Sequence, residues 1–444
     1  MLRSHLQTGL RLRSLTPLLT ALLFLAGSAL AAQETVIQPF NNANGFDPVS
    51  GPVADEAGNL YGTTFTGGKD ECGTVYRLSA PAQMGGAWTK TAFYSFHCGA
   101  DGGLPYGGLI FDKRGNLYGT TTLGGGGSCL GGCGTVFELV RPTKKGHRWT
   151  KSILYTFQGG TTDGSYPEAS LVFDTQGNLY GTSLLGGGSE CGGRGCGTVY
   201  ELSPPQQEGG AWSEAVLHTF VVGVPSTDGT EPSCNLIFDT AGNLYGTTGG
   251  GGSYNAGAIF ELSPPATKGE AWSETVIYSF IGLPDGSNPM AGLVLAPGGV
   301  FYGTASGLGP SLGGTVFELA PPAQMGGAWT ETVLHGFTLG ADGGSPLASV
   351  VLDAAGNLYG TTLIGGNYSC DPGVFVYGCG VVYKLAPPAV EGEEWTETIL
   401  HNFSGGGDGI QPLGGLTFGK FGLLYGTTEE GGPSGAGTVF SVTR

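Results

Sequence analysis

Basic side chains are scarce in this sequence. It holds 18 lysines and arginines against 35 aspartates and glutamates, which gives a formal net charge of -17 at pH 7. Because a polyanion is bound through clustered lysine and arginine, this composition argues against nucleic acid as a partner. Divalent cations and neutral ligands remain compatible with an acidic chain, and solubility outside the cell is a sufficient reason for the acidity.

Long hydrophobic runs are scarce as well, and the N-terminus has the one clear example. Residues 15–26 are mostly apolar, precede the small residues of the segment 29–31, and follow Arg3, Arg11 and Arg13. These are the three parts of a secretory signal peptide, so we expect residues 1–31 to be a signal peptide and residues 32–444 to form a single mature domain. A retained membrane anchor is the alternative, although the run is short for a spanning helix. No other segment is long and apolar enough to span a bilayer.

The sequence also lacks the short motifs of common enzyme classes. It contains no nucleophile elbow, phosphate-binding loop, metalloprotease helix or dinucleotide fingerprint. A site assembled from single residues on several repeats leaves no such motif, so an enzyme of that kind stays open. No segment has helical character, and we therefore expect an all-β chain.

Glycine, by contrast, is abundant and belongs to a repeat. The 87 glycines do not follow the strict every-third spacing of collagen. Many lie in near-copies of the phrase Gly-Asn-Leu-Tyr-Gly-Thr-Thr. The seven copies are spaced 57 to 66 residues apart and carry Tyr61, Tyr118, Tyr180, Tyr245, Tyr302, Tyr359 and Tyr425. Self-similarity at such a period indicates one domain of seven repeat units rather than several ordinary domains.

Each unit contains four segments with strand character, bounded by Gly, Pro, Asp or Asn. In the third unit they are residues 171–173, 178–182, 197–202 and 211–220. The turn between the first two, residues 174–178, ends in Gly-Asn, which supplies the positive φ that a tight hairpin requires. Four antiparallel strands in a repeat of this length predict a β-propeller with seven blades.

The two chain ends test the ring independently. Residues 34–40 match the fourth strand of a unit, whereas residues 437–442 match a third strand. The last unit therefore lacks its fourth strand, and the N-terminus brings a spare one. In an open solenoid these ends would stay far apart as unpaired edges, whereas in a ring they meet. We expect the N-terminal strand to close the last blade.

The chain has nine cysteines, and disulfides are the default interpretation in a secreted protein. Three pairs are local to the loops between the second and third strands: Cys129 with Cys133, Cys191 with Cys196, and Cys370 with Cys379. The start of a third strand lies beside the end of a fourth strand, so Cys72 and Cys98 are expected to form the other bond. Cys234 remains as a buried free thiol. Zinc binding by the paired cysteines is the weaker alternative.

The two faces of the expected disc receive different loops. We call the first the entry face; it receives the loops that enter the first strand and those that join the second strand to the third, residues 163–170 and 183–197 in the third unit. The opposite face, the hairpin face, receives the loops between first and second and between third and fourth strands, residues 174–178 and 203–211 in that unit. Variable loops on the entry face are where a repeat scaffold usually carries specificity.

An aspartate followed by glycine recurs on the entry face, just before the first strand. Six units have it, and Asn44-Gly45 replaces it in the seventh. The six are Asp101, Asp163, Asp228, Asp285, Asp342 and Asp408. Asp-Gly is an ordinary turn dipeptide, and a residue repeated in every blade usually builds the blade. A ring of carboxylates near a channel mouth also suits calcium, which takes several oxygen ligands, so calcium is the one candidate cofactor.

The loops between second and third strands differ in length and content, and two of them place an aromatic residue beside an amide. These candidate binding residues are Tyr254, Asn255, Asn367 and Tyr368. Aromatic rings stack on sugars and peptides, and amides hydrogen-bond to them. Solvated loop tips with scattered tyrosines are the alternative. We assign no catalytic residue, because the fourth-strand position of His218, His335 and His401 is tyrosine or glutamine in other units, which argues against a shared general base.

The full unit, Asp-Gly-x-x-Pro, then Asp-x-x-Gly-Asn-Leu-Tyr-Gly-Thr-Thr, then Gly-Thr-Val-Phe-x-Leu, resembles the GloVer tandem repeat of bacterial secreted proteins. The resemblance covers nearly all of the chain after the signal peptide. It implies a β-propeller-like protein that is secreted or displayed on the cell surface, often through a C-terminal anchor, with no characterised activity. This chain ends with a third strand followed by Thr443-Arg444 and shows no anchor, so we expect release into the periplasm or medium.

Three function classes are compatible with these observations. The first is a secreted binding module that holds an extracellular polysaccharide or protein across the entry face. The second is a metal-dependent hydrolase or lyase of the lactonase-like propeller type, with a channel-mouth metal held by aspartates as Lewis acid. The third is a structural envelope protein. An enzyme needs a metal and asymmetric polar residues at the channel mouth, whereas a binding module needs neither.

Overall fold

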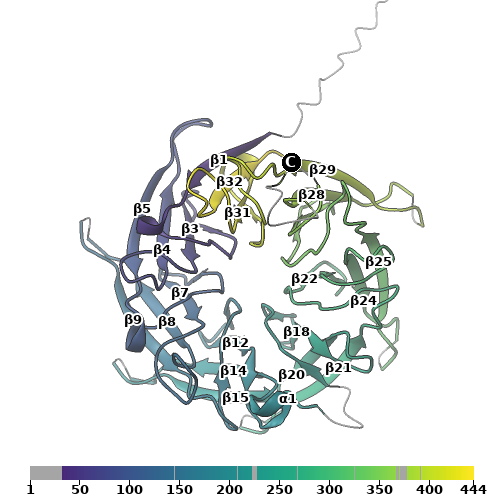
Figure 1. Ribbon diagram of the computed structural model, residues 1–444. Coiled ribbons are helices and arrows are strands. Elements are labelled where there is room, and N and C mark those ends of the chain that lie inside the picture. The colour runs from purple at the N-terminus through teal and green to yellow at the C-terminus, as the bar shows by residue number, and fades with distance from the viewer. Residues whose placement is uncertain are drawn as a thin grey trace, which may run out of the picture. The chain divides into compact units, whose positions relative to one another are not determined.

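Seven four-stranded antiparallel sheets form a ring around a central opening (Figure 1). The computed structural model describes residues 33–144, 146–207, 209–222, 228–267, 269–324, 326–366, 370, 378–390 and 392–444. The predicted seven-bladed β-propeller, with four antiparallel strands in each blade, is confirmed. The expected signal peptide and the candidate residues Asn367 and Tyr368 lie outside the described residues.

The strands follow one another outward from the opening, and blades 1 to 7 are numbered in the order given. The first strands are β2 (Val53–Ala54), β6 (Ile110–Phe111), β11 (Val172–Phe173), β17 (Ile237–Phe238), β22 (Val294–Leu295), β26 (Val351–Leu352) and β30 (Thr417–Phe418). The second strands are β3 (Leu60–Thr64), β7 (Leu117–Thr121), β12 (Leu179–Ser183), β18 (Leu244–Thr248), β23 (Phe301–Ala305), β27 (Leu358–Thr362) and β31 (Leu424–Thr428). The third strands are β4 (Thr74–Ser79), β8 (Thr135–Val140), β14 (Thr198–Ser203), β20 (Ala258–Ser263), β24 (Thr315–Ala320), β28 (Val381–Ala386) and β32 (Thr438–Val442). The fourth, outermost strands are β5 (Thr89–Ser95), β9 (Thr150–Thr156), β15 (Ser213–Thr219), β21 (Ser273–Ser279), β25 (Thr330–Gly336), β29 (Thr396–Asn402) and β1 (Glu34–Pro39).

The entry-face loops add a few short elements. Two small ladders pair β10 (Gly164–Ser165) with β13 (Leu185–Gly186) and β16 (Gly229–Thr230) with β19 (Gly250–Gly251). The expectation that no segment is helical needs one correction, because α1 (Glu190–Gly193) forms a single turn inside a second-to-third loop. Three 3-10 turns are η1 (Asn42–Asn44), η2 (Gly99–Asp101) and η3 (Lys420–Gly422). Among the described residues no helix is long and apolar enough to cross a membrane.

The N-terminal strand closes the ring, as the chain ends predict. β1 pairs antiparallel with β32, from Glu34 opposite Val442 to Pro39 opposite Thr438. Phe40 follows β1 and is 1% exposed in a core shared by the last blade and blade 1. Because β32 would otherwise be an unpaired edge strand, this pairing covers it and gives blade 7 the four strands of the other blades.

The first hairpin of a blade is held by its aspartate. In blade 1 the Oδ1 atom of Asp55 accepts hydrogen bonds from the backbone N–H groups of Ala57 and Asn59, at 3.0 and 2.9 Å. Its Oδ2 atom accepts from the Asn59 amide and from the Tyr61 hydroxyl. The same arrangement recurs at Asp112, Asp174, Asp239 and Asp353. Blades 5 and 7 lack this aspartate, and in blade 7 the Tyr425 hydroxyl donates instead to the carbonyl of Lys420.

Threonines of the second strands join neighbouring blades. The Oγ1 atom of Thr120 in blade 2 donates to the carbonyl of Ala169, which leads into blade 3, at 3.1 Å. Thr427 of blade 7 donates to the carbonyl of Ser50 before blade 1, at 3.1 Å, so the series also crosses the ring closure. The other donors are Thr63, Thr182, Thr247, Thr304 and Thr361. Every junction between blades therefore has one such buried hydrogen bond.

Tryptophans at the start of the fourth strands pack on the preceding blade. Trp149 of blade 2 lies edge-on to Tyr61 of blade 1, with ring centroids 6.2 Å apart, and Trp88 contacts Tyr425 of blade 7 in the same way. The rings thus serve packing between blades, which explains their regular placement.

All four expected disulfides are present. The structure bonds Cys129 to Cys133, Cys191 to Cys196, Cys370 to Cys379 and Cys72 to Cys98. Cys234 is free and buried, and burial raises the pKa of its thiol. A thiol in this state is a poor nucleophile, so the structure gives it no catalytic role.

Candidate functional site

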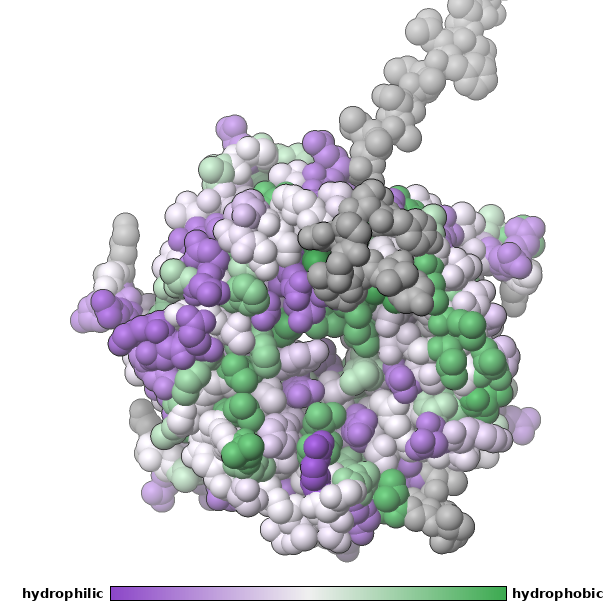
Figure 2. Space-filling model, viewed as in Figure 1, coloured by the Kyte–Doolittle hydropathy of each residue, from purple (hydrophilic) through white to green (hydrophobic). Residues whose placement is uncertain are grey.

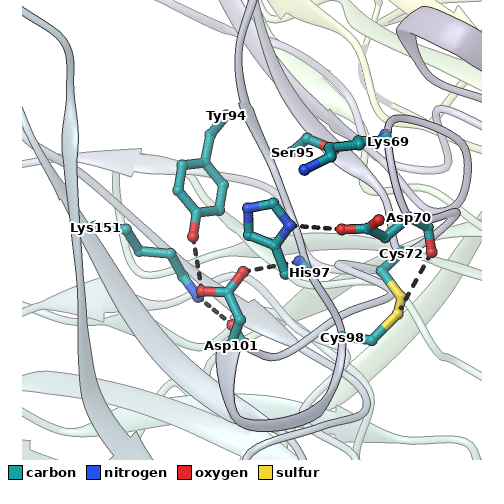
Figure 3. Close-up of polar contacts among 9 residues, drawn as sticks. All are labelled: Lys69, Asp70, Cys72, Tyr94, Ser95, His97, Cys98, Asp101 and Lys151. Atoms are coloured by element: carbon teal, nitrogen blue, oxygen red, sulfur yellow. Dashed lines mark hydrogen bonds and ion pairs between the residues drawn. A yellow bond between two sulfur atoms is a disulfide. The ribbon is translucent and has the colours of Figure 1, made fainter.

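The six Asp-Gly aspartates build the turns in which they lie. In Figure 3, Asp101 accepts hydrogen bonds from the Tyr94 hydroxyl at 2.7 Å and from the backbone N–H of His97 at 2.9 Å. Asp163, Asp228, Asp285, Asp342 and Asp408 likewise accept from a backbone N–H four to seven residues earlier. A tyrosine or histidine of the outermost strand faces each of them, as His218 does Asp228 at 3.2 Å.

The structure does not bring these six aspartates together. Each one is tied to the outermost strand that precedes it in the chain, and none lines the central channel. A single ion at the channel mouth is therefore outside their reach. The sequence could show which face carries these residues, whereas their distance from the ring axis depends on the path of each turn.

Five of the aspartates face a glutamate from the next blade, a feature that the sequence analysis missed. These glutamates lie at the start of the outermost strands and are Glu34, Glu214, Glu274, Glu331 and Glu397. Burial is the main cause that raises their pKa values from 4.5 to about 7, or to about 8 for Glu397. In the sequence, four of these glutamates could have been recognised from the recurring phrase Trp-Ser-Glu or Trp-Thr-Glu. At the first junction a lysine replaces the glutamate: the Lys151 ammonium lies 3.1 Å from Asp101 (Figure 3).

One such junction contains three potential metal ligands. Donor atoms of His218, Asp228 and Glu274 all lie within 4.8 Å of one another. The same three residue types recur at His335, Asp342 and Glu397 and at His401, Asp408 and Glu34, whereas other junctions have tyrosine in place of the histidine. The contact between His218 and Asp228 matches the tyrosine–aspartate contact of those junctions. The common pattern favours a structural interpretation of the junction over a dedicated metal centre.

The central channel has the asymmetry that the junctions lack. Its cavity of about 330 Å³ opens at the centre of the disc, where the space-filling view is hollowed (Figure 2). The seven blades each contribute the residue that follows the proline before the first strand, and in order these are Val49, Tyr106, Glu168, Ser233, Met290, Leu347 and Leu413. Blades 2 to 4 thus present polar side chains, whereas blades 5, 6, 7 and 1 present apolar ones.

The polar half of the channel includes groups that are costly to bury. Burial raises the pKa of Glu168 from 4.5 to about 7, and it raises that of Tyr106 to about 12 with a further contribution from Glu168 and Glu429. The hydroxyl of Ser233 is buried without a hydrogen-bond partner among the described residues. Buried polar groups of this kind are usually satisfied, so an orphan in a channel wall is typical of a ligand-facing surface.

Further carboxylates lie beside the polar half on the entry face. Asp47 and Glu429 have pKa values raised to about 6 and about 7, in both cases first by burial and then by the neighbouring carboxylates. Glu430 contributes to both shifts. The position after the proline varies between units inside an otherwise constant phrase, with only leucine occurring twice, and that variability was the sequence signal for the channel lining.

Of the four candidate residues in the second-to-third loops, two can be placed. Tyr254 is 66% exposed at the tip of its loop, and Asn255 has a positive φ of 56°. Its amide oxygen accepts a hydrogen bond from the N–H of Gly251 at 3.4 Å, so Asn255 has a local structural contact. Asn367 and Tyr368 lie outside the described residues.

Comparison with known proteins gives a family. A family model described as the Gloeobacter/Verrucomicrobia repeat matches residues 27–233, 140–280 and 268–444. No curated protein matches the chain at a significant level.

Similar solved structures are distant. A candidate 6-phosphogluconolactonase from Bacteroides uniformis is 16% identical, covering 83% of this chain and 88% of its own, with a TM-score of 0.49. A protein of unknown function from Dyadobacter fermentans is 13% identical over 83% of this chain and 98% of its own, with a TM-score of 0.42. A calcium structure of a carbohydrate-active enzyme of family AA12 from Trichoderma reesei is 11% identical over 91% and 99%, with a TM-score of 0.44. These likenesses carry no conclusion about ligand or activity.

Proposed function

The chain belongs to the Gloeobacter/Verrucomicrobia repeat family, and from that premise we propose that it is a secreted binding module. Its ligand is an extracellular polysaccharide or surface protein, held across the entry face at the mouth of the central channel. Four disulfides support an oxidising compartment, where such bonds persist.

The divided lining of the channel is the observation that carries this proposal. Residues that only build the blade repeat from unit to unit, as the aspartates and tryptophans do. The residues after the prolines vary between units, with only leucine occurring twice, and they separate into the polar arc of Tyr106, Glu168 and Ser233 and an apolar arc. A sugar ring or a peptide has an apolar face and polar edges, so an opening with one apolar and one polar side suits it.

Retention on polysaccharides tests the proposal. The mature protein is run through native gels that contain individual soluble polysaccharides, and a retarded band identifies a ligand. We expect the variants Tyr106→Ala and Glu168→Gln to lose at least about tenfold in affinity, which is roughly 1.4 kcal/mol, and Tyr254→Ala to lose less.

Met84→Ala is the matched control, because Met84 is a 61% exposed side chain on the hairpin face. Retention that is equal in wild type, Tyr106→Ala and Glu168→Gln would place the ligand elsewhere. The same variants are tested in pull-downs with surface proteins if no polysaccharide retards the wild type.

A metal-dependent hydrolase or lyase is the second candidate, and the carboxylates Asp47, Glu429 and Glu430 beside the polar arc favour it. Oxygen ligands of this type suit calcium. The test is a thermal melt after exhaustive chelation, with and without added calcium. A site in the folded state stabilises by about 2.7 kcal/mol at a hundredfold excess over its dissociation constant, which a melt detects easily. An unchanged melting temperature removes calcium and this candidate with it.

A further inference from the structure

We propose that a second site, on the hairpin face between blades 1 and 2, binds an acidic oligosaccharide through its carboxylates. The site is a cavity of about 750 Å³. Blade 1 contributes Tyr61, Arg77 and Phe93 to its wall. The loop of blade 2 that joins β8 to β9 contributes Arg141, Pro142, Lys144 and the four residues from Gly146 to Trp149. The site lies on the opposite face from the channel mouth and extends beyond the function proposed above.

The charge of this cavity is opposite to that of the molecule. Arg77, Arg141, Lys144 and Arg148 line it together with His147, in a chain with a formal charge of -17 and 18 basic residues in all. The position of Arg148 is alanine or glutamate in the other units, and that of Arg77 is glutamate in four of them. Blade 6 also has a basic residue, Lys384, at the position of Arg77, but the combination of Arg77 with Arg141, Lys144 and Arg148 occurs at this junction and is not part of the repeat.

These basic groups lack acidic partners. Among the described residues, none of the four arginine and lysine side chains forms an ion pair. The Nε atom of Arg77 is buried without a hydrogen-bond partner in that part of the chain, and its guanidinium lies 5.7 Å from the centroid of the Tyr61 ring. On the blade 1 side, Asp55 accepts a hydrogen bond from the Tyr61 hydroxyl at 3.2 Å. A buried guanidinium donor without a partner favours an external acceptor.

Aromatic rings form the other part of the wall. Phe93 and Trp149 are stacked, with centroids 4.9 Å apart and planes at 28°, and both are only partly buried. Each therefore offers apolar surface next to the basic groups.

Basic side chains and aromatic rings in one cavity favour a sugar that carries carboxylates. Guanidinium groups bind carboxylates in a bidentate manner, and Arg77, Arg141 and Arg148 supply three of them. The apolar face of a sugar ring packs on aromatic side chains. A short sugar acid fits within the local positive field, whereas a dense polyanion such as nucleic acid extends beyond it and meets the acidic surface.

Calorimetry with a matched pair of ligands tests the site. The probes are trigalacturonate and its trimethyl ester, which share three sugar rings but differ by three negative charges. We expect the mature protein to bind trigalacturonate at least tenfold more tightly than the ester. Arg148→Ala and Arg77→Ala should each weaken trigalacturonate binding at least fivefold. Arg114→Ala is the control, because Arg114 is an exposed arginine on the hairpin face of the same blade that does not line the cavity.

The outcomes separate this site from the channel mouth. Tyr106→Ala and Glu168→Gln should leave trigalacturonate binding unchanged, so failure of the channel proposal does not affect this one. Equal affinity for the acid and its ester, no detectable binding of the acid, or equal losses in Arg148→Ala and Arg114→Ala would overturn the proposal. Displacement of the sugar acid by inorganic phosphate or sulfate at the same concentration would reduce the site to a simple anion site and also overturn it.

Discussion

Close packing explains the glycine that recurs in every second strand. In blade 2, a Cβ atom built on Gly119 would lie 2.8 Å from the Phe137 ring and 3.0 Å from Leu109. Its neighbour Thr120 reaches the next blade, and Thr121 shares a hydrogen bond of 2.8 Å with the Thr135 hydroxyl. In the Gly-Thr-Thr of the repeat, the glycine allows close packing, the first threonine bonds to the next blade, and the second bonds to the third strand of its own blade. These three roles explain why the phrase recurs along the chain.

Replacing that glycine by alanine should destabilise the protein through close contacts, because the backbone φ of Gly119 is one that alanine also adopts. The variant Gly119→Ala forces the Phe137 ring to move, and overpacking of this kind costs about 1–3 kcal/mol. The measurement is the free energy of unfolding from urea denaturation. Gly407→Ala is the control, since nothing lies within 4 Å of a Cβ built there. Equal stability of the two variants would contradict this account of the repeat.

The facing carboxyls at the junctions make stability depend on pH. The pKa of Glu214 is raised from 4.5 to about 7 by burial and by Asp163, so the folded state holds this proton more tightly than the unfolded chain does. A group of this kind contributes stability that is fully present below about pH 4.5 and is lost as pH rises through about 7. Tyr155 and Tyr200, the other titratable groups beside this pair, stay protonated over that range.

The variant Glu214→Gln should therefore be more stable than wild type at about pH 8, and its advantage should shrink toward about pH 5. Thermal melts across this range give the comparison. Glu56→Gln, at an exposed turn, serves as the control for loss of one charge. If Glu214→Gln lowers the melting temperature equally at both pH values, the carboxyl is charged in the folded state and the assignment is wrong.

At the scale of the element, the first hairpins follow directly from the sequence. The Asp-x-x-Gly-Asn turn was predicted from local chemistry, and the structure shows the reason: Asp174 accepts from the N–H groups of Gln176 and Asn178, both at 2.8 Å. Strand ends were less well predicted. The first strand expected at 171–173 is β11 (Val172–Phe173), and the fourth strand expected at 211–220 is β15 (Ser213–Thr219).

The variant Asp174→Ala should destabilise blade 3 by about 1–3 kcal/mol, because it removes acceptors for two backbone donors and for the Asn178 amide. Native-state hydrogen exchange resolves the effect: faster exchange should be largest in β11 and β12. Gln176→Ala, at an exposed position of the same turn, should change little. Uniform acceleration in all blades would instead mean that the hairpin does not open locally.

The candidate site was predicted less well than the fold, for a physical reason. Repetition reveals the residues that recur in each blade, among them the Asp-Gly aspartates, and in the structure Asp101 accepts hydrogen bonds from the Tyr94 hydroxyl and the His97 N–H. A ligand surface on a repeat scaffold is made of residues that break the repetition. Glu168 in the channel and Arg148 in the basic cavity each differ from the residues at the same position in the other units. The sites to which they belong are formed together with residues of other blades, which one unit of sequence does not show.

At the scale of the whole molecule, closure by β1 should control cooperative stability. Deletion of residues 33–40 removes the pairing with β32 and the buried Phe40 side chain. Loss of a buried phenylalanine alone costs about 3–5 kcal/mol, and the exposed edge favours self-association. A thermal melt and size-exclusion chromatography measure both effects. A synthetic peptide of residues 33–40, added in trans, should restore the melt, and an undiminished melting temperature of the truncated protein would contradict closure.

Hydrogen exchange of the mature protein with its best polysaccharide ligand tests the central claim most directly. Binding across the entry face predicts protection in the peptides that line the channel, residues 47–50, 104–109 and 166–171, with little change in the hairpin-face loop at 141–149. Protection confined to the hairpin face, or none at saturating ligand, would contradict a binding site at the mouth of the channel.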